Sequence, residues 1–357
     1  MMISLPAKYA FAAITLILAA GCRKEQLAPD SSDVPSGAPL VTVVYSPGAL
    51  GDRSYNDLIY TGVERAALSR GLRTMQLSPS TASEGLAILQ EYFKQMREPR
   101  DTVRRLLIVA GTEYDDFLRE SGDALKDNPL SDLLYLETSE PLPGEGSTIC
   151  LPYYGAMYEA GAVSCAFSYN YKILLVAANP VLPVMQESVR GFTEGFNADY
   201  LPPDNDKELL TEWLSDEAGG GFSIDDDKAM EIVYGDDRFA VAPLVFPVCG
   251  GASGAFYRLS DLFGGYDYIG IDAAVVSRHC PFSVVKHIDR AVDLCIGEWL
   301  SPDGMPKHQT LSFADGWTEV ILHPYTEMQK YLSGEYLPAE LLRTIHDDAV
   351  KKEAGYE

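Results

Sequence analysis

The stretch LVTVVYSPGALGDRSYND, from Leu40 to Asp57, contains the clearest indication of the fold. It opens with LVTVVYS, an apolar and partly β-branched run that is typical of a buried strand. The turn that follows is rich in polar and charged side chains, namely Asp52, Arg53, Ser54, Asn56 and Asp57. Apolar residues then recur at spacings of three and four, which predicts one face of an α-helix. A strand, a polar turn and a helix in this order indicate an α/β fold.

Two roles are open for this turn. Ser54 and Asp57 fit the S-x-x-D pattern of a capping box, in which the two side chains satisfy free N–H groups at the start of a helix. That pattern leaves Asp52 and Asn56 unexplained, and we expect both to point into the space beyond the strand. The turn is therefore predicted to cap a helix through one pair of residues and to line a ligand site through the other.

The same alternation of strand and helix continues along the chain. Further strands are predicted at 73–77, 104–111, 132–138, 172–178, 209–215, 241–248 and 266–272. Helices are predicted at 83–96, 113–126, 153–169, 183–197, 224–234 and 254–263, and the one at 153–169 is rich in small residues suited to close packing. The series restarts after residue 150, so we predict two α/β lobes with parallel sheets. Ligands of such sheets bind beyond the carboxyl ends of the strands.

Composition excludes several classes of function. The chain has 357 residues and a formal net charge of -24, which suits two lobes and repels nucleic-acid backbones. Neither a G-x-G-x-x-G nor a G-x-x-x-x-G-K motif occurs, and the five histidines show no metal-ligand spacing. We therefore expect no nucleic-acid partner, no cofactor, no metal and no enzymatic activity.

The N-terminus is predicted to be a targeting segment rather than part of the fold. Residues 9–22, YAFAAITLILAAGC, form an apolar run that is short for a membrane span and ends at Cys22. The end of this run, LAAGC, resembles a bacterial lipobox, which predicts a lipid attached to Cys22. An ordinary secretory signal is the alternative. Residues 23–38 are polar and rich in Pro and Ser, as in a flexible tether, and the other five cysteines are predicted to be mostly buried thiols.

Two loops after predicted strands each contain a residue that could contact a ligand or could have a purely structural role. Asp115 lies in the loop 111–116, where it also suits the first turn of a helix. Phe222 follows three glycines in the loop 219–225, where it would serve either as a stacking platform or as a lid residue folded onto the core.

Three further candidates lie in the last third of the chain. Gly250 and Gly251 occur in a glycine-rich loop that permits close backbone approach to a ligand. Asp272 ends a predicted strand, and Lys286 follows after an expected crossover between the lobes. A carboxylate and an ammonium group in one cleft can together hold neighbouring hydroxyl groups of a ligand.

The chain resembles the basic membrane protein family of substrate-binding lipoproteins of ABC importers, which includes purine-nucleoside receptors. The resemblance spans roughly residues 40 to 325 and rests on an ordered set of motifs. These are GDRSYNDLIYTGVERAALSRG, YYGAMYEAGAVSCAF, VLPVMQESVRGFTEGFNA, GGFSIDDDKAMEIVY, LVFPVCGGASGAFYRL, YIGIDAAV, FSVVKHIDRAVD and FADGW.

The resemblance implies a periplasmic-binding-protein type I fold, with two Rossmann-like lobes of parallel sheet joined by a three-stranded hinge. It implies a lipoprotein signal peptide at 1–21, followed by an acylated Cys22 with a tether over 22–38. The N-terminal lobe would contain 39–152 plus 285–307, and the C-terminal lobe 153–284 plus 308–324. A helical segment at 325–357 would follow the lobes. The protein would be a monomer on a bacterial membrane, facing the periplasm or the exterior, with an ABC permease as partner.

The resemblance also implies ligand contacts. In nucleoside-binding members two aromatic rings stack on the base; Phe222 matches one, and Leu50 stands at the position of the other. Asp52 and Asn56 match polar positions of the family's opening signature. Asp272 and Lys286, with the backbone of Gly250 and Gly251, match the groups that hold the ribose, and Asp115 is expected to face the base.

The sequence thus predicts a lipid-anchored solute-binding protein that captures a nucleoside, a purine nucleoside above all, or a similar small polar ligand. One alternative is a sensor of the same fold that signals to a membrane partner. Another is a nucleoside-processing enzyme, which would need a poised acid–base pair that the sequence does not display.

Overall fold

The computed structural model describes residues 34–47, 50–97, 102–121, 125, 128–168, 171–200, 207–217, 219–235, 244–323 and 337–356. The predicted signal peptide, Cys22 and most of the tether lie outside these residues, as does the first part of the predicted C-terminal segment. The chain divides into the units Met1–Ser36 and Gly37–Glu357, and the fold described below is that of the second unit.

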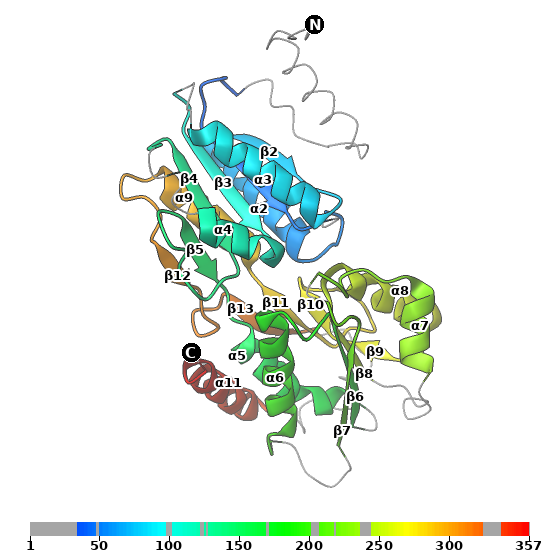
Figure 1. The fold of residues 1–357 in the computed structure, drawn as a ribbon. Helices are drawn as coiled ribbons and strands as arrows, with labels where there is room; N and C mark the ends of the chain where they lie inside the picture. Colours follow the sequence, from blue (N-terminus) through cyan, green and yellow to red (C-terminus); the bar gives the residue numbers. More distant parts are fainter. Residues whose placement is uncertain are drawn as a thin grey trace, which may run out of the picture. The chain divides into compact units, whose positions relative to one another are not determined.

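The first lobe is built on a six-stranded sheet in which every neighbouring pair is parallel (Figure 1). The strand order is β12-β5-β4-β3-β1-β2. Their bounds are β1 Leu40–Tyr45, β2 Arg73–Leu77, β3 Arg105–Ala110, β4 Ser131–Leu136, β5 Ser147–Cys150 and β12 His308–Thr310.

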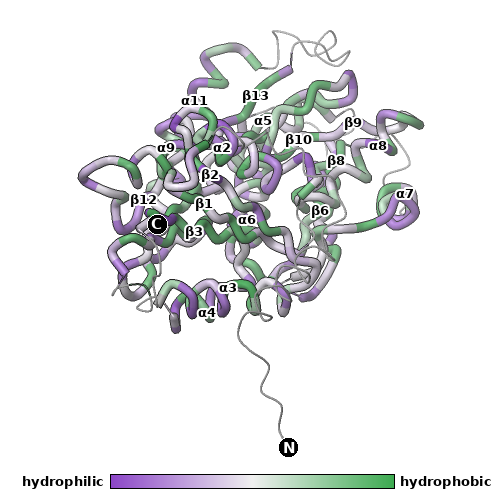
Figure 2. Tube along the Cα trace, turned by 90° about the horizontal axis from the view of Figure 1, so that it is seen from above, coloured by the Kyte–Doolittle hydropathy of each residue, from purple (hydrophilic) through white to green (hydrophobic). Residues whose placement is uncertain are grey.

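Helices cover both faces of this sheet, because its strands are apolar on both sides. On one face Val43 packs with α2 (Tyr55–Arg70) and α9 (Ile288–Leu300). On the other face the next residue, Val44, packs with α3 (Ala82–Arg97) and α4 (Asp115–Ser121). In Figure 2 the outer helix α4 shows hydrophilic stretches interleaved with hydrophobic ones, as expected for a helix that is half buried.

The second lobe has a four-stranded parallel sheet in the order β7-β6-β8-β9. Its strands are β6 Lys172–Ala177, β7 Glu208–Trp213, β8 Leu244–Val248 and β9 Asp267–Tyr268, and its helices are α5 Tyr154–Ser164, α6 Pro183–Asn197, α7 Asp226–Tyr234 and α8 Ser253–Phe263. The predicted close packing of α5 is confirmed. A β-carbon added to Gly161 would lie 2.1 Å from the carbonyl oxygen of Phe192 in α6.

A three-stranded sheet in the order β10-β11-β13 lies between the two lobes (Figure 1). Its strands are β10 Gly270–Asp272, β11 Phe282–Lys286 and β13 Thr318–Leu322. β11 pairs in parallel with β10 and antiparallel with β13. The chain passes from β11 directly into α9 of the first lobe and returns from β12 into β13. The predicted two-lobe α/β fold with parallel sheets is therefore confirmed.

The structure differs from the predicted lobe boundaries at one strand. Residues 308–324 were predicted to belong to the C-terminal lobe, but β12 pairs with β5 in the sheet of the first lobe. The reason is that α9 packs against α2, so the chain leaves α9 beside the first sheet and adds one short strand before it crosses. The other boundaries stay predictions.

The C-terminal helix α11 (Ala339–Ala354) packs against the start of α5 in the second lobe. Its residue Glu353 is only 5% exposed and accepts hydrogen bonds from the backbone N–H of Gly155 and of Phe313, both at 2.8 Å. In the described part of the chain, no helix is both long enough and apolar enough to cross a membrane.

Candidate functional site

Four of the predicted ligand contacts meet where the first and second lobes touch. Asp52, in the loop after β1, lies against Gly251 of the turn after β8: a β-carbon added to Gly251 would lie 3.3 Å from the β-carbon of Asp52. Phe222 lies against Gly250, where an added β-carbon would be 3.1 Å from the ring. Gly250 also has a φ of +53°, so the close approach and the backbone conformation both favour glycine there.

Asp272 lies at the end of β10 and is bound by hydroxyl groups from two directions. Its two carboxylate oxygens accept hydrogen bonds from the Ser54 hydroxyl and from the Tyr153 phenol. The side chains are buried, and Asp272 itself is 6% exposed. Because Ser54 belongs to the first lobe and Asp272 to the end of β10, this contact joins the first lobe to the sheet between the lobes.

Lys286, at the end of β11, is not paired with Asp272. Its ammonium group donates to Oε2 of Glu137 at 2.8 Å, and the side chains are 2% and 12% exposed. The same nitrogen lies 3.8 Å from the centroid of the Tyr153 ring, a cation–π contact that strengthens when water is excluded. Tyr153 therefore contacts both predicted ribose-binding residues, through its hydroxyl and through its ring.

The predicted capping box is wrong, because the roles of the turn residues are exchanged. The side chain of Ser54 makes no cap hydrogen bond. Asp52 caps α2 instead: its carboxylate accepts from the N–H groups of Ser54 at 2.8 Å, Asn56 at 3.0 Å and Asp57 at 3.2 Å. The charged acceptor Asp52 satisfies the free N–H groups better than a hydroxyl would, which leaves the Ser54 hydroxyl for Asp272.

The two remaining candidates lie in the first lobe. Leu50 packs against the apolar cluster under α2 and α9. Asp115, in the first turn of α4, forms an ion pair with Arg119 at 2.7 Å, so its carboxylate has a local partner one helical turn away. Whether either residue meets a ligand stays a prediction.

Sequence reasoning missed Glu137, Tyr153 and the hydroxyl of Ser54. Glu137 follows β4 and Tyr153 follows β5, so the rule that ligands bind beyond the carboxyl ends of parallel strands also applied to them. Glu137 and Asp272 share a second property, because both are non-glycine residues with a positive φ, of 63° and 64°. Such backbone conformations are uncommon and concentrate at functional sites.

Burial dominates the electrostatics of this site. It raises the pKa of Asp52 and of Glu113 above their ordinary values, against hydrogen bonds that lower them. Burial also raises the pKa of Glu137, while the nearby Lys286 ammonium lowers it. The thiol of Cys150 has its pKa raised to about 12 by burial, with a smaller contribution from Glu137, so it is a packing residue rather than a reactive thiol.

These raised pKa values predict that the protein is more stable in mildly acidic solution than at neutral pH. Asp52, Glu113 and Glu137 bind protons more tightly when folded than their ordinary pKa values of 3.8, 4.5 and 4.5 imply. The stability that the folded protein gains from the protonated forms of these acids is therefore fully present below those values. It is lost as the pH rises through the pKa of each acid in the folded state. We expect the free energy of unfolding to fall as the pH rises from about 5 to about 7.

Urea unfolding at several pH values measures this slope. Glu113→Gln should flatten it, whereas Glu120→Gln, at an exposed position of α4, should leave it unchanged. A free energy of unfolding that rises from pH 5 to pH 7 in the unmodified protein would contradict the prediction.

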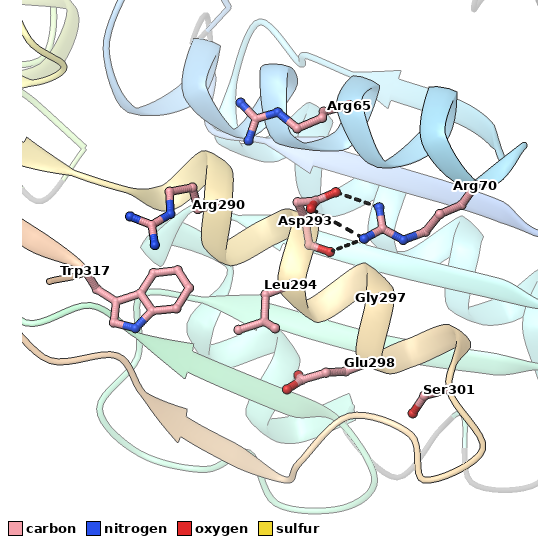
Figure 3. A pocket seen from close by; sticks show the side chains of 9 residues that line it. All are labelled: Arg65, Arg70, Arg290, Asp293, Leu294, Gly297, Glu298, Ser301 and Trp317. Carbon is pink, nitrogen blue, oxygen red and sulfur yellow. Dashed lines mark hydrogen bonds and ion pairs between the residues drawn. The ribbon is translucent and has the colours of Figure 1, made fainter. Parts of the chain in front are cut away.

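A pocket of about 490 Å³ lies on α2 and α9 in the first lobe, and it contains none of the predicted site residues (Figure 3). Arg70 in its wall is held by Asp293 at 2.6 Å, and Arg290 lies over the Trp317 ring at 5.1 Å. Its cationic groups are thus largely engaged within the protein, and we place the candidate site at the lobe contact instead.

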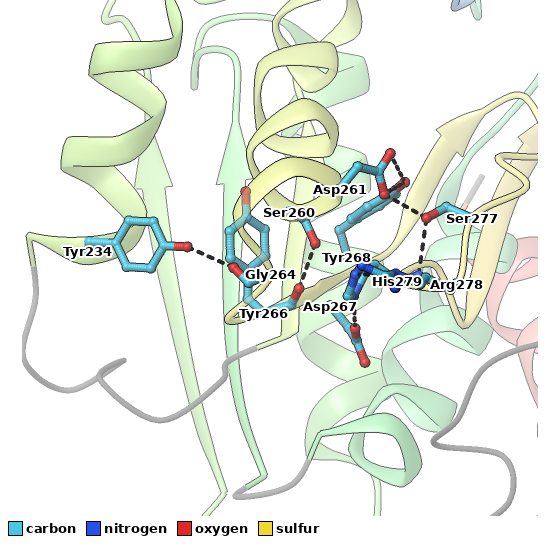
Figure 4. A network of polar contacts seen from close by, with 10 residues as sticks. All are labelled: Tyr234, Ser260, Asp261, Gly264, Tyr266, Asp267, Tyr268, Ser277, Arg278 and His279. Carbon is cyan, nitrogen blue, oxygen red and sulfur yellow. Dashed lines mark hydrogen bonds and ion pairs between the residues drawn. The ribbon is translucent and has the colours of Figure 1, made fainter.

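A polar network in the second lobe fixes the connection between β10 and β11 (Figure 4). Ser277 donates to Asp261 at 2.7 Å, and the ring of His279 lies 3.1 Å from Asp267. The backbone carbonyl of His279 accepts from the N–H of Tyr268 at 2.8 Å. This connection begins after Asp272 and ends before β11, so the network helps to hold the strand ends that present Asp272 and Lys286.

No protein-family model and no curated protein matches this sequence. Solved structures do match. An ABC transporter solute-binding protein from Aeropyrum pernix K1 aligns with a TM-score of 0.68 at 14% identity, over 89% of this chain and 92% of that one. This chain has the periplasmic-binding-protein type I fold.

Two regulators share the periplasmic-binding-protein type I fold. A transcriptional activator of the comK gene from Bacillus halodurans aligns with a TM-score of 0.61 at 17% identity, over 87% of this chain and 96% of that one. A LacI family transcriptional regulator from Enterococcus faecalis V583, solved with bound ribose, aligns with a TM-score of 0.54 at 14% identity, over 80% of this chain and 98% of that one. At these identities the likeness establishes the fold alone.

Proposed function

We propose that this chain is a solute-binding protein that holds a small polar ligand between its two lobes and delivers it to an ABC permease. One observation carries the proposal: loops that follow strands of both lobes converge on one buried polar cluster. Ser54 of the first lobe bonds to Asp272 at the end of β10, and Asp52 lies against Gly251 of the second. A ligand in contact with this cluster would touch both lobes at once.

The proposed ligand is a nucleoside or a similar polyhydroxylated solute. Asp272 already accepts two hydroxyl groups, from Ser54 and Tyr153, which is the chemistry needed to hold two neighbouring hydroxyls of a sugar ring. Phe222 lies beside Gly250 at the same place and offers an aromatic face for a flat base. With Leu50 in the first loop, stacking on the base would come from Phe222 alone.

The proposed mechanism is hinge closure. The three-stranded sheet β10-β11-β13 connects the lobes, and the ligand contacts of Asp52 and Asn56 lie on one side of it while those of Phe222, Gly250 and Gly251 lie on the other. Contacts to both lobes exist together only in the closed state, so the ligand shifts the population toward closure. Asp115 would add a contact from the first lobe.

We place the protein in the bacterial cell envelope, held to a membrane by lipid on Cys22 and facing the periplasm or the exterior. This rests on the lipobox-like sequence before Cys22. Mass spectrometry of the protein from its native membrane, with Cys22→Ser as control, would show a diacyl or triacyl mass on the N-terminal cysteine. An N-terminus at another residue would reject the lipid anchor.

Native mass spectrometry of whatever co-purifies with the protein, followed by calorimetry with nucleosides and sugars, tests the proposed function. We expect a ligand bound unchanged with a Kd of about 1 μM or tighter, and we expect Asp272→Asn to weaken binding by at least about tenfold. If no nucleoside or sugar produces heat or a thermal shift, the proposal fails. A chemically altered ligand would favour an enzyme instead.

A ligand sensor is the second candidate, favoured by the two transcriptional regulators that share the fold. A solute-binding protein and a sensor can be distinguished by the effect of deleting the gene. Deletion of the gene should abolish uptake of the labelled ligand if the protein delivers solute, whereas uptake should persist and a transcriptional response disappear if it is a sensor.

A further inference from the structure

The first lobe presents a row of hydrogen-bond acceptors at the carboxyl ends of three adjacent strands. β4, β3 and β1 are neighbours in the sheet, and Glu137, Glu113 and Asn56 follow them in that order. Each of these residues has a buried oxygen with no hydrogen-bond partner in the described structure: Oε1 of Glu137, Oε1 of Glu113 and Oδ1 of Asn56. Only two other buried side-chain atoms in the described residues share this property, Nε of Arg73 and the hydroxyl of Tyr92.

With both glutamates ionised, all three atoms of the row accept hydrogen bonds and cannot donate them. The orientation of the Asn56 amide is determined by Asp52, because its Nδ2 donates to Oδ2 of that carboxylate at 2.9 Å and a carboxylate cannot donate. Glu137 uses its other oxygen for Lys286 at 2.8 Å, and Glu113 uses its other oxygen for the Ser46 hydroxyl at 3.2 Å. Buried acceptors are nearly always satisfied by protein groups or by ordered water, so these atoms suit a ligand that supplies donors.

The charge around the row is negative and largely uncompensated. The contacts of Asp52 are N–H groups, those of Asp272 are hydroxyls, and Glu113 meets a hydroxyl. The nearby cations are engaged, because Lys286 is paired with Glu137 and Arg119 with Asp115. An anionic ligand would have to enter against these carboxylates, and the net charge of -24 adds a long-range repulsion.

We infer that the ligand of this site carries a protonated amine together with its hydroxyl groups, and that the amine binds the acceptor row of Asn56, Glu113 and Glu137. An ammonium group donates hydrogen bonds and carries one positive charge, which suits the free acceptors and the uncompensated carboxylates. Hydroxyl groups of the same molecule would bind Asp272. The inference rests on the proposed function and narrows it to amino sugars, amino-substituted nucleosides and related hydroxylated amines.

Calorimetry with matched triplets of compounds tests the inference. One triplet is glucose, glucosamine and glucose 6-phosphate, and the other is adenosine, 5′-amino-5′-deoxyadenosine and adenosine 5′-monophosphate. We expect the amine of at least one triplet to bind at least about tenfold more tightly than its neutral partner, and the phosphate not to bind. Glu113→Gln should remove most of this preference, and Glu120→Gln, a carboxylate exposed on α4, should leave it unchanged.

The outcomes separate this inference from the proposed function. The inferred preference for an amine would be rejected if a neutral sugar or nucleoside binds as tightly as its amine, or if a phosphate binds most tightly. The proposed solute-binding function would still stand in either case. Circular dichroism would check that Glu113→Gln and Glu137→Gln are folded. If the preference for the amine survives in both variants, the acceptor row is not the amine-binding site. If no member of either triplet binds, the inference and the proposed function fail together.

Discussion

Gly195→Ala is expected to lower the free energy of unfolding by more than about 3 kcal/mol, or to prevent folding. Gly195 lies in α6 where this helix crosses α5, and an added β-carbon would lie 1.9 Å from the carbonyl oxygen of Tyr158. The clash is with backbone, so no side-chain rotation relieves it and the two helices must move apart. The gain of about 1 kcal/mol that alanine brings to a helix interior does not compensate.

Thermal and urea unfolding measure this effect, with Gly219→Ala as the control. A β-carbon added to Gly219 meets no atom within 4 Å, so that variant should unfold within about 0.5 kcal/mol of the unmodified protein. Equal stability of the two variants would show that α5 and α6 are not as close as described.

Lys286→Ala is expected to lower the free energy of unfolding by about 3–5 kcal/mol, in addition to any effect on ligand binding. A lysine that served only the ligand would be replaced without loss of stability. In the structure its ammonium is 2.8 Å from Glu137, and the two side chains are 2% and 12% exposed. Removal of the lysine leaves a carboxylate buried without its cation.

A double variant separates the ion pair from simple loss of packing. Lys286→Met with Glu137→Gln keeps the volume of both side chains and removes both charges, and it should recover most of the stability lost in Lys286→Ala. If the double variant is less stable than Lys286→Ala, the pair contributes net stability and burial of the charge is not the cause of the loss.

The alternation of strands and helices was predictable because parallel strands buried on both faces are long apolar runs. LVTVVY and KILLVA are such runs, and both are central strands. β5 and β12 were not predicted, since strands of only four and three residues have no distinctive apolar pattern. The close packing of α5 and α6 was predictable from small residues, although the partner helix was not.

The candidate site was predictable only in outline. The strand-end rule pointed to Asp52, Gly250, Gly251 and Asp272, and the structure brings their loops together. It could not determine which of Asp52 and Ser54 caps α2, because both residue types cap helices well. The choice depends on Asp272, which lies more than two hundred residues later in the chain, and no local pattern contains that information.

The passage of the chain back into the first lobe has a consequence for biosynthesis. α9 covers the face of the first sheet that contains Val41 and Val43, yet its residues are synthesised long after those strands. A ribosome that has translated the first five strands has therefore produced a sheet face that α2 covers only in part. We expect this nascent lobe to need chaperone protection until α9 emerges, and any truncation before residue 288 to yield aggregates rather than a folded half.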